Sequence, residues 1–301
     1  MSDAVVPKHH AFSVARISAI ASNTLLELVR QKVFYFMLVF AVLGIGSSFV
    51  ASGWKFAEQF QVLKDVSLGA MSVFSWLLAT LATAMVLPKD LEDRTLYTIL
   101  AKPVSRLEYL LGKFAGVLLL LFIALSLMAA VFFLVLYARE HVAIAETVGD
   151  FGGQPSPELQ AAIEEVKRNA FTPGLGTAVL VIFTKAAVCA SLTLTLSTFA
   201  TSWIFTVMTS IAIYIIGQVQ PIAREYWLNE VPDAQVSTIT KAFLGIVAVI
   251  FPDFRLFNVV DEIVVGNAVP GWMLTQTFGL GVGYIFIFTL VGYVCFANRE
   301  L

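Results

Sequence analysis

Long apolar runs alternate with short polar segments along most of the chain. A membrane-spanning helix needs about 20 mostly apolar residues, and runs of that length occur six times. The pattern therefore predicts six transmembrane helices. They cover Val33–Gly53, Gly69–Leu87, Phe114–Tyr137, Gly176–Phe199, Trp203–Val219 and Leu274–Ala297.

Other segments predict shorter helices. Over residues 11–32, apolar side chains share one helical face and charged ones the other, which predicts an amphipathic helix in the cytoplasmic interface. The run Thr240–Phe251 is too short to span and predicts a re-entrant helix before the last transmembrane helix. Ser156-Pro157-Glu158 favours the start of an outer helix, because each residue type suits a helix N-terminus. Gly112 and Gly116, one turn apart, predict close packing against another helix.

Composition supports the same class of protein. Hydrophobic residues make up 58% of the chain and charged residues 13%, with a mean hydropathy of +0.85. Soluble domains carry about 45–50% apolar and about 25% charged residues. We therefore expect an all-α membrane protein with a single transmembrane domain over residues 1–301. Cys189 and Cys295 lie in apolar stretches, so neither a disulfide framework nor a metal site is expected, and no removable signal peptide is evident.

The distribution of Lys and Arg predicts the orientation. With both termini in the cytoplasm, the inner segments hold ten Lys/Arg and seven Asp/Glu, whereas the outer segments hold eight and fourteen across more residues. This bias agrees with the positive-inside rule. The inner segments are then residues 1–32, 88–113, 200–202 and 298–301, and the outer ones are residues 54–68, 138–175 and 220–273.

Charged residues also mark two candidate sites on a transport path. Lys185 lies within the fourth predicted span, where an ammonium costs several kcal/mol unless it snorkels or finds a partner. Either it packs against the bundle or it contributes to a transport path. Asp253 and Arg255 follow the predicted re-entrant helix, where an interface role and a gate for substrate are both open.

The segment over residues 88–113 combines charge with apolar anchors. Pro88 is predicted to end the second span, because proline cannot donate to a continuing helix. Between Lys89 and Lys102, leucine, isoleucine and tyrosine alternate with charged residues, which favours a short surface helix that Pro103 stops. Apolar anchors set among charges are typical of a surface that docks into a partner protein.

Within this segment, residues 92–116 read E-D-R-T-L-Y-T-I-L-A-K-P-V-S-R-L-E-Y-L-L-G-K-F-A-G. This sequence resembles the cytoplasmic segment of type-2 ABC transporter permeases (the ABC-2 family), nearest to the branch associated with multi-copper enzyme maturation. Many members of that family have glycine where this chain has Arg94. The positions that match the family pattern are Glu92, Arg94, Thr95, Leu96, Ile99, Leu100, Pro103, Ser105, Arg106, Gly112 and Lys113.

The resemblance implies the permease subunit of an exporter in a bacterial cytoplasmic membrane. It also implies an interfacial N-terminal helix, six spans, and short re-entrant helices before the last. Two ATPase subunits would bind ATP and Mg, a second permease copy would complete the pair, and a periplasmic accessory protein is a further expected partner. The segment over residues 88–113 would carry a coupling helix that enters the ATPase. That role falls on Glu92, Asp93, Arg94, Thr95, Pro103 and Arg106.

An enzyme is not expected. The chain has no G-x-x-x-x-G-K-[ST] phosphate loop and no H-E-x-x-H motif, and Glu164, Glu165 and Arg168 have the wrong spacing for a prenyl-protease pattern. No catalytic, cofactor-binding or metal-binding residue is therefore assigned. Two other classes remain open: a permease-like subunit that transmits force to an envelope process without moving a solute, and a secondary transporter.

Overall fold

The computed structural model describes most of the chain. It covers residues 12–52, 59–92, 104–152, 156–200, 202–228, 251–265 and 269–298, with a few residues between 239 and 246. All regular secondary structure in these ranges is helical. The elements are α1 (Val14–Val29), α2 (Lys32–Ser52), α3 (Gln59–Glu92), α5 (Arg106–Asp150), α6 (Pro157–Ala170), α7 (Leu175–Phe199), α8 (Trp203–Leu228), the 3-10 helix η1 (Phe254–Phe257), α10 (Val259–Val265) and α11 (Gly271–Ala297).

Six stretches of helix in the described ranges are long and apolar enough to cross a membrane. They comprise α2, α3, α5, α7, α8 and α11, and they correspond to the six predicted runs. The prediction of an all-α fold is confirmed over the described residues, and the length and apolar character of these six helices support the prediction of a membrane protein. α7 is the most enclosed of these helices, whereas few residues of α2 and α11 are buried.

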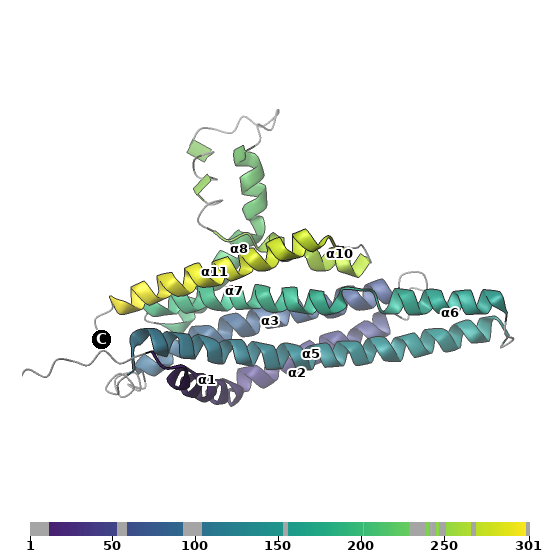
Figure 1. Ribbon diagram of the computed structural model, residues 1–301, viewed down its shortest axis with the longest axis horizontal. Helices are drawn as coiled ribbons and strands as arrows, with labels where there is room; N and C mark the ends of the chain where they lie inside the picture. The colour runs from purple at the N-terminus through teal and green to yellow at the C-terminus, as the bar shows by residue number, and fades with distance from the viewer. Residues whose placement is uncertain are drawn as a thin grey trace, which may run out of the picture.

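α7 lies at the centre of the bundle and contacts α3, α5, α8 and α11 (Figure 1). Its second half carries a run of buried hydroxyls, each bonded to a carbonyl of its own helix. The hydroxyl of Thr195 also donates to Phe288 O of α11, at 2.6 Å. This run therefore serves helix packing. The hydroxyls belong to Ser191, Thr193, Thr195, Ser197 and Thr198.

α5 and α6 form a hairpin that projects past the other helices (Figure 1). α5 has 45 residues; at 1.5 Å per residue it is about 68 Å long, more than twice the roughly 30 Å hydrocarbon core of a bilayer. α6 begins as predicted, because Ser156 Oγ accepts a hydrogen bond from Leu159 N at 3.1 Å. A short link joins α6 to α7, and in it Gly174 has a φ of 106°, a conformation that favours glycine.

α1 packs along the start of α5, and the two glycines predicted to permit close packing make this contact possible. A Cβ atom placed on Gly112 would lie 2.7 Å from Ile20 Cβ, and one placed on Gly116 would lie 2.6 Å from Thr24 Cβ. Both distances are too short for carbon atoms. The predicted N-terminal helix is present over Val14–Val29, and its buried face is held by α5.

The end of α3 corrects one prediction. The helix continues through Pro88 to Glu92, so Pro88 does not end it. A proline inside a helix removes one main-chain hydrogen bond, but the added turn places Asp90 beside Lys113 of α5, and this buried ion pair holds it in place. The predicted surface helix beyond Glu92 lies outside the described residues, as does most of Thr240–Phe251.

Candidate functional site

Figure 1 shows α1 beside the start of α5 at one end of the bundle. Charged side chains gather there, close to the ends of α3 and α11. This end corresponds to the predicted cytoplasmic segments. We call the group the basal cluster. It consists of Arg16, Glu27, Lys89, Asp90, Arg106, Glu108, Tyr109 and Lys113.

Lys113 is at the centre of the basal cluster. Its Nζ lies 2.7 Å from Asp90 Oδ2 and 3.6 Å from Glu27 Oε2, and the Lys113 and Asp90 side chains are only 3% and 9% exposed. The Tyr109 hydroxyl donates to the same Asp90 oxygen. Because buried charges interact with little screening by water, these contacts tie α1, α3 and α5 together.

Glu108 joins the beginnings of α1 and α5. Its Oε1 accepts hydrogen bonds from Ser13 N at 2.7 Å and from Arg16 Nη2 at 2.8 Å. Its Oε2 accepts from Ser105 N at 2.9 Å, and Ser105 Oγ accepts in return from Glu108 N at 3.2 Å. This reciprocal pair is a capping box. Three donors stabilise the ionised carboxylate and fix both helix starts.

Arg106 is the one predicted coupling residue whose side chain the structure describes. Its Nη1 donates to Phe296 O at 3.0 Å and to Ala297 O at 2.7 Å. These carbonyls belong to the last turn of α11, where side chains with N–H donors commonly bond to the free carbonyls of a helix end. Arg106 therefore ties the start of α5 to the end of α11.

The other predicted coupling residues are placed only in part. Glu92 is the last residue of α3, and its side chain is outside the description. Asp93, Arg94, Thr95 and Pro103 lie outside the described residues. The structure thus places the end of α3 and the start of α5, which flank residues 93–103 in the sequence, at the basal cluster.

Sequence reasoning did not assign a role to most of the basal cluster. One local signal was available, because Ser105 followed three residues later by Glu108 is the pattern of a capping box. The ion pair of Asp90 with Lys113 joins two helices and has no short-range signature. Lys113 itself appeared only as a position of the family pattern.

Lys185 lines a separate, partly open cavity of about 260 Å³ between α3, α7, α8 and α10. The residue is 8% exposed, and its Nζ lies 5.7 Å from the centre of the Tyr214 ring. Within the described ranges, its ammonium has neither a hydrogen bond nor a salt bridge, so the ring face is the contact that the structure provides. The polar residues that line the cavity are Asp65, Ser72, Lys185, Tyr214, Asn258 and Asp261.

Asp253 and Arg255 line a neighbouring cavity of about 350 Å³, and Asn258 contributes to both cavities. Asp253 Oδ1 accepts a hydrogen bond from Arg255 N at 2.9 Å and so caps η1. The structure therefore places these two residues next to the Lys185 cavity but not in it.

In the part of the chain that the structure describes, no three His, Cys, Asp or Glu side chains are grouped as a metal site would require. Comparisons with known proteins found no matching family model and no matching curated protein. The function is therefore inferred from the residues themselves.

Proposed function

We propose that this chain is the membrane-spanning permease subunit of an ABC-2-type exporter. In this proposal two permease chains pair, separate ATPase subunits bind ATP and Mg, and residues 88–113 receive their movement. The observation that supports the proposal is the basal cluster, which holds the end of α3 and the start of α5 on either side of residues 93–103 and joins four helices.

A force applied to a loop moves whole helices only if the helix ends resist fraying. The last turn of α3 is held by the ion pair of Asp90 with Lys113, and the first turn of α5 is held by Glu108 and Arg106. Breaking a buried ion pair costs about 3–5 kcal/mol. A pull on residues 93–103 would therefore shift α1, α3, α5 and α11 together.

The two adjoining cavities at Lys185 and at Asp253 and Arg255 provide the proposed transport path. A buried ammonium without a hydrogen-bond partner inside a membrane domain is by default a candidate functional group. In our proposal Lys185 contacts the solute, and Asp253 and Arg255 lie at a gate next to it. The three residues line adjoining cavities that share Asn258.

One observation favours the second candidate, a permease-like subunit that transmits force to an envelope process without moving a solute. The α5–α6 hairpin extends past the bundle (Figure 1) and gives an outer protein a surface to bind. In that case the basal cluster would have the same role, but the two adjoining cavities would not take part.

Photo-crosslinking tests the proposal in intact cells. Benzoylphenylalanine replaces Thr95 in the segment proposed to enter the ATPase, and Phe122, an exposed residue in the middle of α5, as the control. We expect the Thr95 probe alone to capture a subunit with a G-x-x-x-x-G-K-[ST] motif, identified by mass spectrometry. ATP hydrolysis by that subunit should rise when it is reconstituted with the permease. Absence of a nucleotide-binding subunit from the Thr95 adducts would contradict the proposal.

A further inference from the structure

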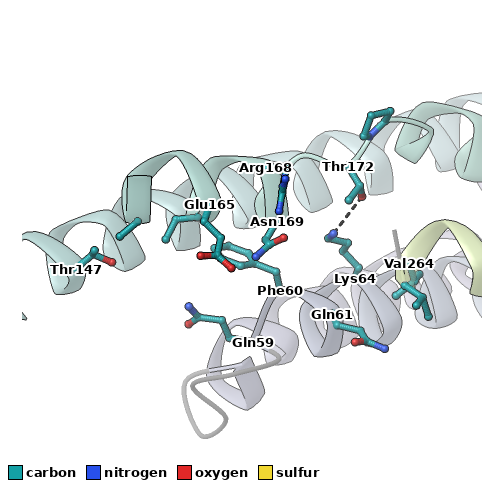
Figure 2. Close-up of a pocket in the computed structure, with 14 residues that line it drawn as sticks. Gln59, Phe60, Gln61, Lys64, Thr147, Glu165, Arg168, Asn169, Thr172 and Val264 are labelled. Atoms are coloured by element: carbon teal, nitrogen blue, oxygen red, sulfur yellow. Dashed lines mark hydrogen bonds between the residues drawn. The ribbon is translucent and has the colours of Figure 1, made fainter. Parts of the chain in front are cut away.

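A larger polar cavity lies at the opposite end of the bundle from the basal cluster, between α6 and the start of α3. Its volume is about 790 Å³, within the range of about 300–1,000 Å³ that is typical of small-molecule sites. Figure 2 shows side chains from both helices around it. We call it the outer cavity. Its charged, polar and aromatic lining residues include Phe60, Lys64, Glu165, Arg168, Asn169 and Thr172.

Lys64 is the unusual group in this lining. The residue is 2% exposed, and its Nζ donates to the hydroxyl of Thr172 at 3.1 Å. Among the described residues no carboxylate forms a salt bridge with it. An ammonium has three donors, and burying one beside a single neutral acceptor is costly.

A second buried cation nearby shows what Lys64 lacks. Arg139, on the projecting part of α5, bonds to the carboxylate of Glu146 at 3.3 Å and to the side-chain oxygen of Gln59. Its charge is thus balanced by a residue of the chain itself. The charge of Lys64 faces a cavity instead.

The lining is also asymmetric. Figure 2 shows Lys64 and Thr172 at one end of the outer cavity, Glu165 near Phe60 toward the other end, and Arg168 and Asn169 between them. The carboxylate of Glu165 disfavours an anion at its own end. Phe60 and several aliphatic side chains give the lining an apolar part.

We propose that the outer cavity binds a ligand with one carboxylate or phosphate group next to an apolar part. The anionic oxygens would accept from the remaining donors of Lys64 and from the Thr172 hydroxyl, while the apolar part lies against Phe60. A free organic anion and an anionic lipid headgroup both supply this chemistry. The site is independent of any ATPase and stands whether or not the chain is a permease.

Thermal unfolding of the full chain in nanodiscs tests the site. Two probes, inorganic phosphate and hexanoate, are added to protein in phosphatidylcholine discs at matched ionic strength. The third probe is phosphatidylglycerol, which replaces part of the phosphatidylcholine in the discs. We expect at least one probe to stabilise the wild-type protein. Lys64→Met should weaken the binding of that probe about tenfold or more, because the ligand loses a charged hydrogen-bond partner. The matched control is Lys167→Met, an exposed lysine of α6 outside the lining.

A second variant keeps the test decisive if Lys64→Met does not fold. Ala162→Trp retains Lys64 but fills the cavity from the α6 side, and it should abolish the same response. A response to phosphate or hexanoate assigns a free anion, and a response to phosphatidylglycerol alone assigns a lipid headgroup. The proposal is overturned if no probe stabilises the wild type, or if the response survives both Lys64→Met and Ala162→Trp.

Discussion

Lys113→Met tests the energetic weight of the basal cluster. Methionine keeps much of the lysine's length and apolar contact but removes the charge, so Asp90 stays buried without its cation. Loss of one partner of a buried ion pair costs about 3–5 kcal/mol. Lys89→Met is the matched control. The Lys89 Nζ–Glu27 Oε1 distance of 2.8 Å almost equals the 2.7 Å of the Lys113–Asp90 pair, but the Lys89 side chain is 44% exposed. Exposed pairs contribute about 0–1 kcal/mol.

The chain supplies its own reporter for this measurement. Cys189 is buried in α7, so its thiol reacts with a dye only when the bundle opens. In a Cys295→Ser background, titration from mild detergent into sodium dodecyl sulfate would give the free energy of unfolding from Cys189 labelling. We expect Lys113→Met to lose several kcal/mol and Lys89→Met to stay close to wild type.

A third variant separates charge from shape. Replacing Lys113 by Met, Asp90 by Leu and Tyr109 by Phe together removes the ion pair and the hydroxyl that would otherwise lose its acceptor. Substituting a whole buried polar group by apolar residues is often nearly neutral, so most of the lost stability should return. If Lys113→Met and Lys89→Met differ by less than about 1 kcal/mol, burial does not govern these pairs and the reasoning is wrong.

Three further predictions use the same unfolding assay. Gly116→Ala should destabilise the bundle by about 1–3 kcal/mol, since its new Cβ would overlap Thr24 of α1. The control is Gly149→Ala in the same helix, which should be neutral or slightly stabilising because its new Cβ would meet no neighbouring atom within 4 Å. Equal effects of the two variants would contradict the packing argument. Glu108→Gln should destabilise by about 1–3 kcal/mol through its weakened bonds to the starts of α1 and α5, and an unchanged midpoint would argue against its role. Lys185→Met should raise the free energy of unfolding, because it removes a buried charge that no hydrogen bond stabilises. It should also lower transport by the assembled system, because Lys185 is proposed to contact the solute. Unchanged transport would remove Lys185 from the path.

Local patterns predicted much of the fold. Apolar run length located the six long helices, Ser156 located the start of α6, and the spacing of Gly112 and Gly116 indicated a tight helix contact. Each of these signals acts within a few residues of the chain, so it can be read without knowing which helices are neighbours. The prediction that Pro88 ends the span was wrong for the same reason. The lost main-chain hydrogen bond at Pro88 is a local cost, and it is offset by the ion pair of Asp90 with Lys113 on another helix.

The candidate site depends on contacts between distant parts of the chain. Ser13 and Glu108 are 95 residues apart, and Arg106 and Phe296 are 190 residues apart. Such pairs are set by how the helices pack, and one sequence contains no pattern that reports them. Lys185 shows the same limit, since its position in a span was evident but its cavity and the ring of Tyr214 were not.

The length of α5 has a mechanical consequence. One continuous helix carries Glu108, Tyr109 and Lys113 near one end and reaches the tip of the α5–α6 hairpin at the other. A rod of about 68 Å that tilts by about 5° moves its far end by about 6 Å. The helix is thus a lever: a displacement too small to break the ion pairs at its base would be enlarged at the outer hairpin, which lines the outer cavity.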